Sequence, residues 1–274
     1  MDLLEHLTDS SLGFYILLAG FGLVATWEGL HPLRSASVST PRRWRNNVLW
    51  LVFNGLFLRW VLPASAVGWS VLSARHGWGF LSHAGLPSWI GLVLGLLALD
   101  LAGYLGHVLL HKSTLLWRVH AVHHSDVDFD CTTGFRFHPL EGLFTSAIEL
   151  TVIASVGVPP LAVALYETWL GLQNLYGHAN ARFPAVFEKM LRCLVVTPDM
   201  HRIHHSVDIE EGNHNFGIIL PWWDRLFRTY RAEPLHGHEA MQIGLDWRRH
   251  EGGITELFLL PLKTRFPPAR LENN

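Results

Sequence analysis

Four long apolar runs constrain this 274-residue chain more than any other feature of its sequence. They cover residues 12–30, 48–72, 89–110 and 143–175. A helix needs about 20 apolar residues to cross the hydrocarbon core of a bilayer. Charged residues make up only 16% of the chain, against roughly a quarter in soluble domains. We therefore expect an all-α, multi-pass membrane protein with about four spans.

Prolines interrupt two of these runs. Pro63 breaks the second run, and Pro159-Pro160 stand near the middle of the fourth. Proline removes a backbone donor and clashes with the preceding turn, so it does not continue a helix interior. The fourth run is therefore predicted to form a Pro-hinged hairpin that enters and leaves the membrane by the same side. The first run follows a leader without Lys or Arg, which predicts a retained helix rather than a secretory signal.

Positively charged residues in the short loops predict the orientation. Arg34, Arg42, Arg43 and Arg45 lie between the first and second runs, whereas Arg75 alone lies between the second and third. Loops rich in Lys and Arg usually stay in the cytoplasm. The first loop is thus expected there, together with the C-terminal end of the third run and both ends of the hairpin.

The distribution of apolar and charged residues predicts three regions. Residues 1–87 would form N-terminal membrane helices and loops, residues 88–232 a catalytic domain, and residues 233–274 a C-terminal tail. After Gly177 the apolar runs shorten and charged residues return, which predicts a helical cap on the cytoplasmic side. A net charge of −2 argues against nucleic-acid binding, and two cysteines are too few for a thiolate metal site.

Histidine is unusually abundant, with 18 residues, and much of it falls into three short motifs. On a helix, residues three and four apart are neighbours, so each motif can present its imidazoles from one patch. Eight imidazoles exceed the four ligands of a closed zinc site and predict a two-metal centre in the cap. The motifs are His107-x-x-x-His111, His120-x-x-His123-His124 and His201-x-x-His204-His205.

A carboxylate and a phenol share the helix face of the first motif. Tyr104, His107 and His111 follow Asp100 by four, seven and eleven residues. On a helix these spacings place all four side chains within a narrow arc. A carboxylate inside an apolar span is costly and usually functional. Metal-bound histidines commonly donate their second N–H to a carboxylate. We therefore expect Asp100 to orient a histidine, with a helix-packing contact, for example to Arg59, as the alternative.

Several segments together resemble the fatty acid hydroxylase/sterol desaturase superfamily over residues 100–230: DLAGYLGHVLLH, WRVHAVHHS, NLYGHAN, MHRIHHS and NFGIILPWWDRLFRTY. The resemblance implies that the histidine motifs bind two iron ions on the cytoplasmic face. It also implies that His178 is a ninth ligand and that Asn174 contacts a metal or a metal-bound water. The segment from Arg136 to Glu141, with His138, would line the site or anchor a loop. His214 is an alternative ligand.

The same resemblance implies a reaction. Members of the superfamily use dioxygen at a di-iron centre to hydroxylate or desaturate a lipid C–H bond in a fatty acyl chain, sterol, carotenoid or ether lipid. Electrons would come from a separate donor, a reductase with ferredoxin or a small cytochrome. The C-terminus carries no eukaryotic retention signal, which favours a bacterial inner membrane. Two alternatives remain open: a membrane zinc hydrolase, although H-E-x-x-H is absent, and a metal-binding or transport protein without oxygenase activity.

Overall fold

The computed structural model describes residues 10–62 and 64–264, and the regular structure in that part of the chain is entirely helical. His6 and Pro63 lie outside the described residues. The elements at one end of the molecule are mostly long, apolar helices. They are α2 (Ser10–Leu30), α3 (Thr40–Val61), α4 (Ala66–Arg75), the short η1 (Phe80–Ser82), α5 (Ser88–Lys112), α7 (Pro139–Val152), η4 (Ile153–Gly157) and α8 (Pro160–Gly177).

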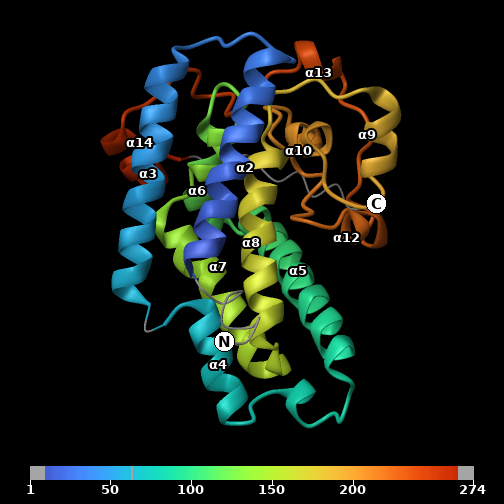
Figure 1. Cartoon of the computed structure of the whole chain (residues 1–274). Coiled ribbons are helices and arrows are strands. Elements are labelled where there is room, and N and C mark those ends of the chain that lie inside the picture. Colours follow the sequence, from blue (N-terminus) through green and yellow to red (C-terminus); the bar gives the residue numbers. More distant parts are fainter. Residues whose placement is uncertain (1–9, 63, 265–274) are drawn as a thin grey trace.

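Short helices build the other end of the molecule, which we call the cap. Figure 1 shows them gathered around the upper ends of α2, α5 and α8, with the long helices extending below. They are α6 (Thr114–His120), η2 (His123–Ser125), η3 (Cys131–Phe135), α9 (Ala185–Leu191), α10 (Pro198–His204), α11 (Ile209–Gly212), α12 (Trp222–Leu226), α13 (Gly237–Ala240) and α14 (Ile254–Lys263).

Four helical stretches are long and apolar enough to cross a membrane: Leu12–Leu30, Thr40–Arg75, Ser88–Lys112 and Pro139–Gly157. Their apolar side chains point outward, as shown by Leu23 at 74% exposure and Trp60 at 84%. A water-soluble bundle would turn such side chains inward, whereas lipid accepts them. The expectation of an all-helical, multi-pass membrane protein is confirmed.

The predicted Pro-hinged hairpin is formed by α7 and α8. A π-helical turn, η4, ends α7, and Pro159 and Pro160 start α8 at the positions where a helix tolerates proline. The two helices run antiparallel and meet at the lower end of the molecule, so α8 returns the chain to the cap (Figure 1). His178 follows directly at the C-terminus of α8.

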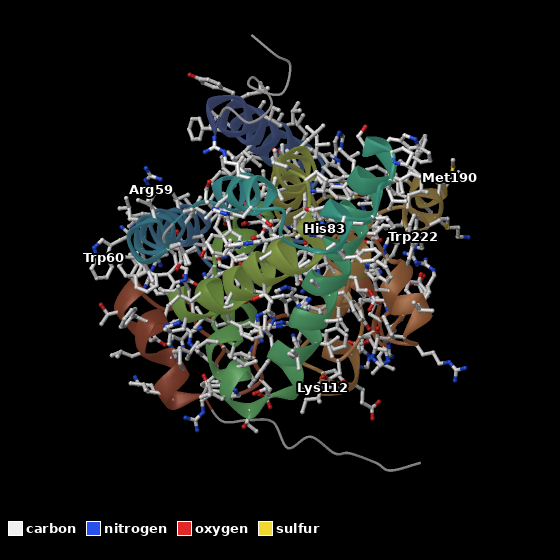
Figure 2. The ribbon with its side chains drawn as sticks, turned by 90° about the horizontal axis from the view of Figure 1, so that it is seen from below. Arg59, Trp60, His83, Lys112, Met190 and Trp222 are labelled. Carbon is white, nitrogen blue, oxygen red and sulfur yellow. The ribbon has the colours of Figure 1, made fainter. Side chains whose placement is uncertain are left out.

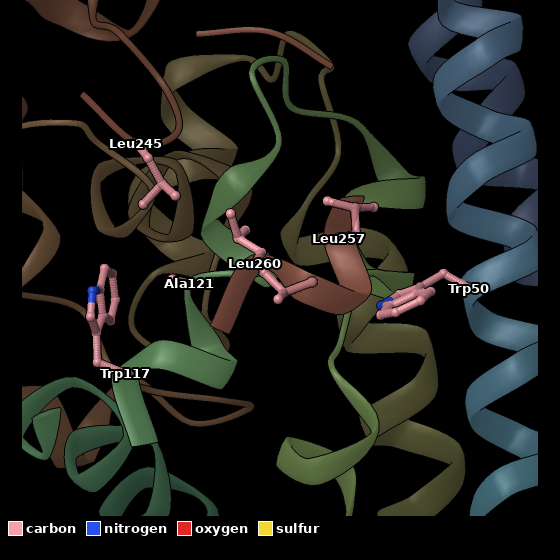
Figure 3. Packing of buried hydrophobic residues seen from close by; sticks show 7 residues of the cluster. Trp50, Trp117, Ala121, Leu245, Leu257 and Leu260 are labelled. Atoms are coloured by element: carbon pink, nitrogen blue, oxygen red, sulfur yellow. The ribbon is translucent and has the colours of Figure 1, made fainter. Parts of the chain in front are cut away.

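The cap is joined to the membrane helices by a buried apolar cluster. Trp50 of α3, Trp117 of α6 and Leu257 and Leu260 of α14 pack together with Leu245 (Figure 3). Residues separated by about 200 positions in sequence therefore share one core. Helix α14 contacts both α6, which carries His120, and Trp50 of α3, so it connects the two helices.

Two glycines touch at the bend of the hairpin. Gly79 has a φ of +83° and Gly157 a φ of +79°. A Cβ added to Gly79 would lie 2.1 Å from the backbone nitrogen of Gly157. Because no side chain fits between the two backbones, the loop before α5 is clamped onto η4. This contact fixes the lower end of the bundle.

We predict that Gly79→Ala destabilises the protein more than Gly85→Ala. Gly85 also has a positive φ of +61°, but a Cβ there would meet nothing within 4 Å. Gly79 combines φ +83° with ψ 160°, a region that essentially only glycine occupies, so alanine there costs about 1–3 kcal/mol in backbone strain. Gly85→Ala carries the positive-φ penalty of about 1–2 kcal/mol, and only Gly79→Ala adds overlap with backbone, a further ~1–3 kcal/mol. Thermal unfolding of the detergent-purified variants measures the difference, and equal midpoints would contradict the clamp.

Candidate metal centre

The structure brings nine buried histidines together in two groups. Within each group the nitrogen atoms that could bind a metal lie within 4.8 Å of one another. The first group contains His107, His111, His120, His124 and His204. The second contains His123, His178, His201 and His205. All nine predicted ligands are in one of these groups, while their binding of metal remains a prediction.

Each H-x-x-H-H motif is divided between the two groups in the same way. His120 and His124, four residues apart, join the first group, while His123 between them joins the second. In the other motif His201 and His205 join the second group and His204 joins the first. Residues i and i+4 share a helix face, and residue i+3 is rotated enough to reach the neighbouring group. The two groups are therefore linked through both motifs.

The spacing of the nitrogens suits a metal ion. The Nε2 atoms of His107 and His120 are 3.2 Å apart, those of His123 and His178 3.2 Å, and those of His178 and His201 3.0 Å. Imidazole nitrogens bind metals at about 2.0–2.1 Å, so two ligands at right angles lie about 3 Å apart. The imidazoles already stand at the separations of adjacent ligands.

Hydrogen bonds on the outer side of the imidazoles fix which nitrogen is protonated. Nδ1–H of His107 donates to the carbonyl of Phe216 at 2.8 Å, and that of His178 to the carbonyl of Asn174 at 2.7 Å. Nδ1–H of His204 likewise donates to the carbonyl of His214 at 2.9 Å. A carbonyl only accepts, so in a neutral imidazole Nε2 is left with a lone pair.

Where two such lone pairs face each other, neither nitrogen carries a proton that could form a hydrogen bond. His204 Nε2 and both ring nitrogens of His205 are buried without a hydrogen-bond partner among the described residues. Lone pairs that face each other at about 3 Å repel, and a cation between them removes the repulsion. The donor set and its orphaned nitrogens therefore fit a pair of metal ions held by imidazole.

Burial keeps several of the grouped histidines neutral by lowering their pKa. Desolvation, reinforced by neighbouring imidazoles, lowers the pKa of His204 to about 3, and desolvation lowers that of His178 to about 4. Burial and adjacent imidazoles also hold the pKa values of His123, His201 and His205 well below the usual range. Metal binding requires the neutral form, so these imidazoles are in the protonation state that a cation needs at pH 7.

A carboxylate that sequence reasoning did not single out contacts a histidine directly. Glu141, in the first turn of α7, accepts a hydrogen bond from Nδ1 of His120 at 2.6 Å, and both side chains are buried. The segment from Arg136 to Glu141 was expected to line the site or anchor a loop. Glu141 has the first role, and no local spacing marks it in the sequence, because its partner His120 lies 21 positions away.

Asp100 differs from the expectation. Instead of a histidine, it contacts the loop after α11: it accepts hydrogen bonds from the amides of Ile219 and Leu220, each at 3.2 Å, and from Trp223 Nε1 at 2.8 Å. The shared helix face was correct, but seven residues raise His107 by about 10 Å along the axis, beyond the reach of a carboxylate. The alternative contact with Arg59 is also wrong, because Arg59 is exposed on the outer side of α3 (Figure 2).

The other candidates surround the two groups without joining them. Tyr104 hydrogen-bonds Thr229 at 2.9 Å, and His138 caps α7 by accepting from the amide of Leu140 at 3.2 Å. Asn174 contributes its backbone carbonyl to His178. The imidazole of His214 hydrogen-bonds the carbonyl of Glu210 and lies in neither group.

An ionic network holds the loop that follows His124. Asp126 is fully buried and forms salt bridges with Arg43 at 2.7 Å and with Arg136 at 3.6 Å. Burial alone would raise the pKa of Asp126, but the two guanidinium groups lower it to about 2. Arg136 also pairs with Glu251 at 2.9 Å. Charges from α3, the loop and the C-terminal region thus converge behind the second histidine motif.

Comparison with known proteins supports the resemblance inferred from the motifs. A family model described as fatty acid hydroxylase matches residues 92–229, about half of the chain. An ornithine lipid hydroxylase of Rhizobium tropici is 31% identical over 191 residues, which cover 67% of this chain and 55% of that protein. The human alkylglycerol monooxygenase is 28% identical over 148 residues, covering 53% of this chain and 31% of that protein.

A third relative extends the similarity over more of the chain. The alkylglycerol monooxygenase of Xenopus tropicalis is 26% identical over 269 residues, 89% of this chain and 54% of that protein. The chain therefore spans about half or less of the length of these relatives. No solved structure matches it.

We predict that Glu141→Leu weakens metal binding by roughly 10–100-fold, the usual effect of removing a carboxylate behind a ligating histidine. Leucine leaves Nδ1–H of His120 without an acceptor and frees the ring to turn. Glu141→Gln retains an acceptor oxygen and is expected to lose much less. Metal retained during dialysis against a chelator measures the effect, and equal losses in both variants would contradict an orienting role.

The neutral imidazoles also predict that the stability of the folded chain decreases as the pH falls. The pKa of His178 is about 4 and that of His204 about 3 in the folded chain, whereas an unfolded histidine titrates near ~6.5. Between these values only the unfolded chain takes up protons, so stability is fully present above about pH 6.5 and lost as the pH falls toward 4. Thermal midpoint and metal content, measured over this interval, should fall together. A flat midpoint would contradict the burial of neutral imidazoles.

Proposed function

The chain belongs to the fatty acid hydroxylase family, and from that premise we propose that it oxidises a lipid C–H bond with dioxygen at a di-iron centre. The observation that carries the proposal is the pair of buried imidazole groups, five and four residues, at one end of a membrane-spanning bundle. A further support is that relatives of the chain are a lipid hydroxylase and monooxygenases. The reaction would be a hydroxylation or a desaturation.

The identity of the metal is part of the proposal. Imidazole binds zinc, copper, nickel and iron, so the ligands alone do not select among them. Family membership and the oxygenase names of the relatives favour iron. When bound, two iron ions would supply the electrons and open positions that dioxygen requires to attack an unactivated C–H bond.

The residues of the chain hold and enclose that centre. The carbonyls of Phe216, Asn174 and His214 and the carboxylate of Glu141 hold four of the nine imidazoles with Nε2 inward. Aromatic rings close the space around them, with Phe137 stacked on His123 at 4.6 Å and Phe216 against His111 at 5.1 Å. Such walls exclude water, which strengthens electrostatic interactions and protects a reactive site from side reactions.

The substrate is proposed to be a membrane lipid with a polar headgroup, because the relatives are named for ornithine lipids and alkylglycerols. The positive loop between α2 and α3 favours a cytoplasmic position for the cap, and we propose a bacterial inner membrane as the location. Electrons would come from a separate donor, a reductase with ferredoxin or a small cytochrome.

The test compares His204→Ala with His214→Ala in membranes supplied with isotopically labelled dioxygen. His204 belongs to the first imidazole group, whereas the side chain of His214 belongs to neither and only its backbone carbonyl contacts His204. The parent and His214→Ala should yield a lipid heavier by one labelled oxygen atom or lighter by two hydrogen atoms. His204→Ala should lose the product and bound iron.

Metal analysis of the purified parent completes this test. Two iron ions per chain support the proposal. A single zinc ion in active protein would instead favour a hydrolase. Two bound metals without any oxygen-dependent lipid product would favour a binding or transport protein.

A further inference from the structure

The cap carries an exposed apolar surface beside α5. It is formed by α9, the residues that follow it and α12 with Phe227, and we call it the lateral surface. Its apolar members are between 49% and 71% exposed: Val186, Phe187, Met190, Leu194, Leu226 and Phe227. Contiguous apolar patches of this kind are uncommon on surfaces that face water and usually mark an interaction.

The two helices form one continuous surface. Trp222 Nε1 on α12 donates to the carbonyl of Cys193 at 2.8 Å, and Arg225 donates to the carbonyl of Arg192 at 2.6 Å. Figure 2, seen from the membrane-helix end, shows Met190 and Trp222 together at one edge of the molecule, next to α5. The ribbon does not cover them from that side.

The register of α12 along α5 places this surface at the level of the bilayer. Trp223 contacts Asp100 at 2.8 Å, and the ring of Phe227 stacks on Tyr104 at 5.4 Å. Asp100 and Tyr104 precede Lys112, the last residue of α5, by 12 and 8 residues. At about 1.5 Å per residue these contacts lie roughly 18 and 12 Å below the end of the spanning helix. Leu105 and Leu109, above them on α5, are still exposed and apolar.

The exposed charged residues of α9, α12 and the residue positions just after α12 are positive. Lys189, Arg225 and Arg228 are exposed. Both acidic residues of α9 and α12, Glu188 and Asp224, are buried at 5% and 0% exposure. Apolar side chains bordered by exposed cations are the pattern of segments that lie in the membrane interface and attract anionic headgroups.

We infer that the lateral surface is inserted into the boundary between headgroups and acyl chains, with Lys189 and Arg228 in contact with anionic lipid headgroups. It continues the lipid-facing side of α5 into the cap. The inference concerns where the cap sits and does not require the proposed reaction.

This contact reaches the imidazole groups through one loop. The loop from residue 213 to 230 carries α12, and its carbonyls at His214 and Phe216 accept hydrogen bonds from His204 and His107. Asp224 holds the same loop by accepting from the amides of Phe216 and Gly217, each at 2.8 Å. The bilayer would therefore support the segment that orients two imidazoles.

Fluorescent labels on single cysteines test the inference in the full chain reconstituted into phosphatidylcholine vesicles with phosphatidylglycerol. The labelled variants are Leu226→Cys and Met190→Cys, with Leu235→Cys as a matched control, because Leu235 is an apolar cap residue that is 54% exposed outside the lateral surface. Cys193→Ser removes the exposed native thiol, and Cys131 is buried. Two quenchers are compared: a nitroxide on the lipid chain near the headgroup, and iodide in water.

Labels at 226 and 190 should be quenched by the lipid nitroxide and lose iodide quenching, while the label at 235 shows the reverse. Iodide quenching at 226 as strong as at 235 would overturn the inference. Exclusion of both quenchers from 226 would also overturn it, because a second copy or another protein would then cover the surface. In Lys189→Gln/Arg228→Gln, nitroxide quenching at 226 should lose its dependence on phosphatidylglycerol. Unchanged dependence would overturn the headgroup contact.

Discussion

Lone pairs of imidazoles that face one another inside a water-free space are the constraint on which the rest of this structure depends. An unpaired buried polar group costs about 1–3 kcal/mol, and the two groups together contain several such nitrogens. A cation offsets this cost, but only if every ring keeps its lone pair inward. A hydrogen bond to the outer nitrogen holds a ring in that orientation.

The cap provides much of that outer support. The carbonyls of His214 and Phe216 come from the loop before α12, whereas Glu141 and the carbonyl of Asn174 belong to the two helices of the hairpin. Of the imidazoles on or next to the membrane helices, His178 is held by a carbonyl of its own helix, whereas His107 is held by a carbonyl of the cap loop. The short helices of the cap contribute the remaining imidazoles, and its loops contribute acceptors. The hinge in the hairpin matters because it returns α8 to the level at which His178 meets His123.

Sequence reasoning predicted what depends on local spacing. The apolar runs predicted the membrane-spanning helices. The spacings of three and four residues identified the histidine motifs, and the structure brings the members of these motifs together. It did not predict which members of each motif join which group, because that depends on how α6, η2 and α10 face each other. Asp100 shows the same limit: the spacing gave the correct angle around α5 but not the axial distance to His107. Glu141 was not singled out because its partner, His120, lies 21 positions away in sequence and meets it only through the packing of α6 on α7.

The pairing of Arg136 with Glu251 has a consequence for the order of synthesis. These residues are 115 positions apart, and Arg136 belongs to the network behind the second histidine motif. A ribosome delivers the last imidazole of the two groups at residue 205, well before Glu251 and α14. The nascent chain thus presents all nine imidazoles while Arg136, in the loop behind the second motif, still lacks its partner Glu251. The ionic network behind the second histidine motif is therefore completed only after the C-terminal region has been synthesised.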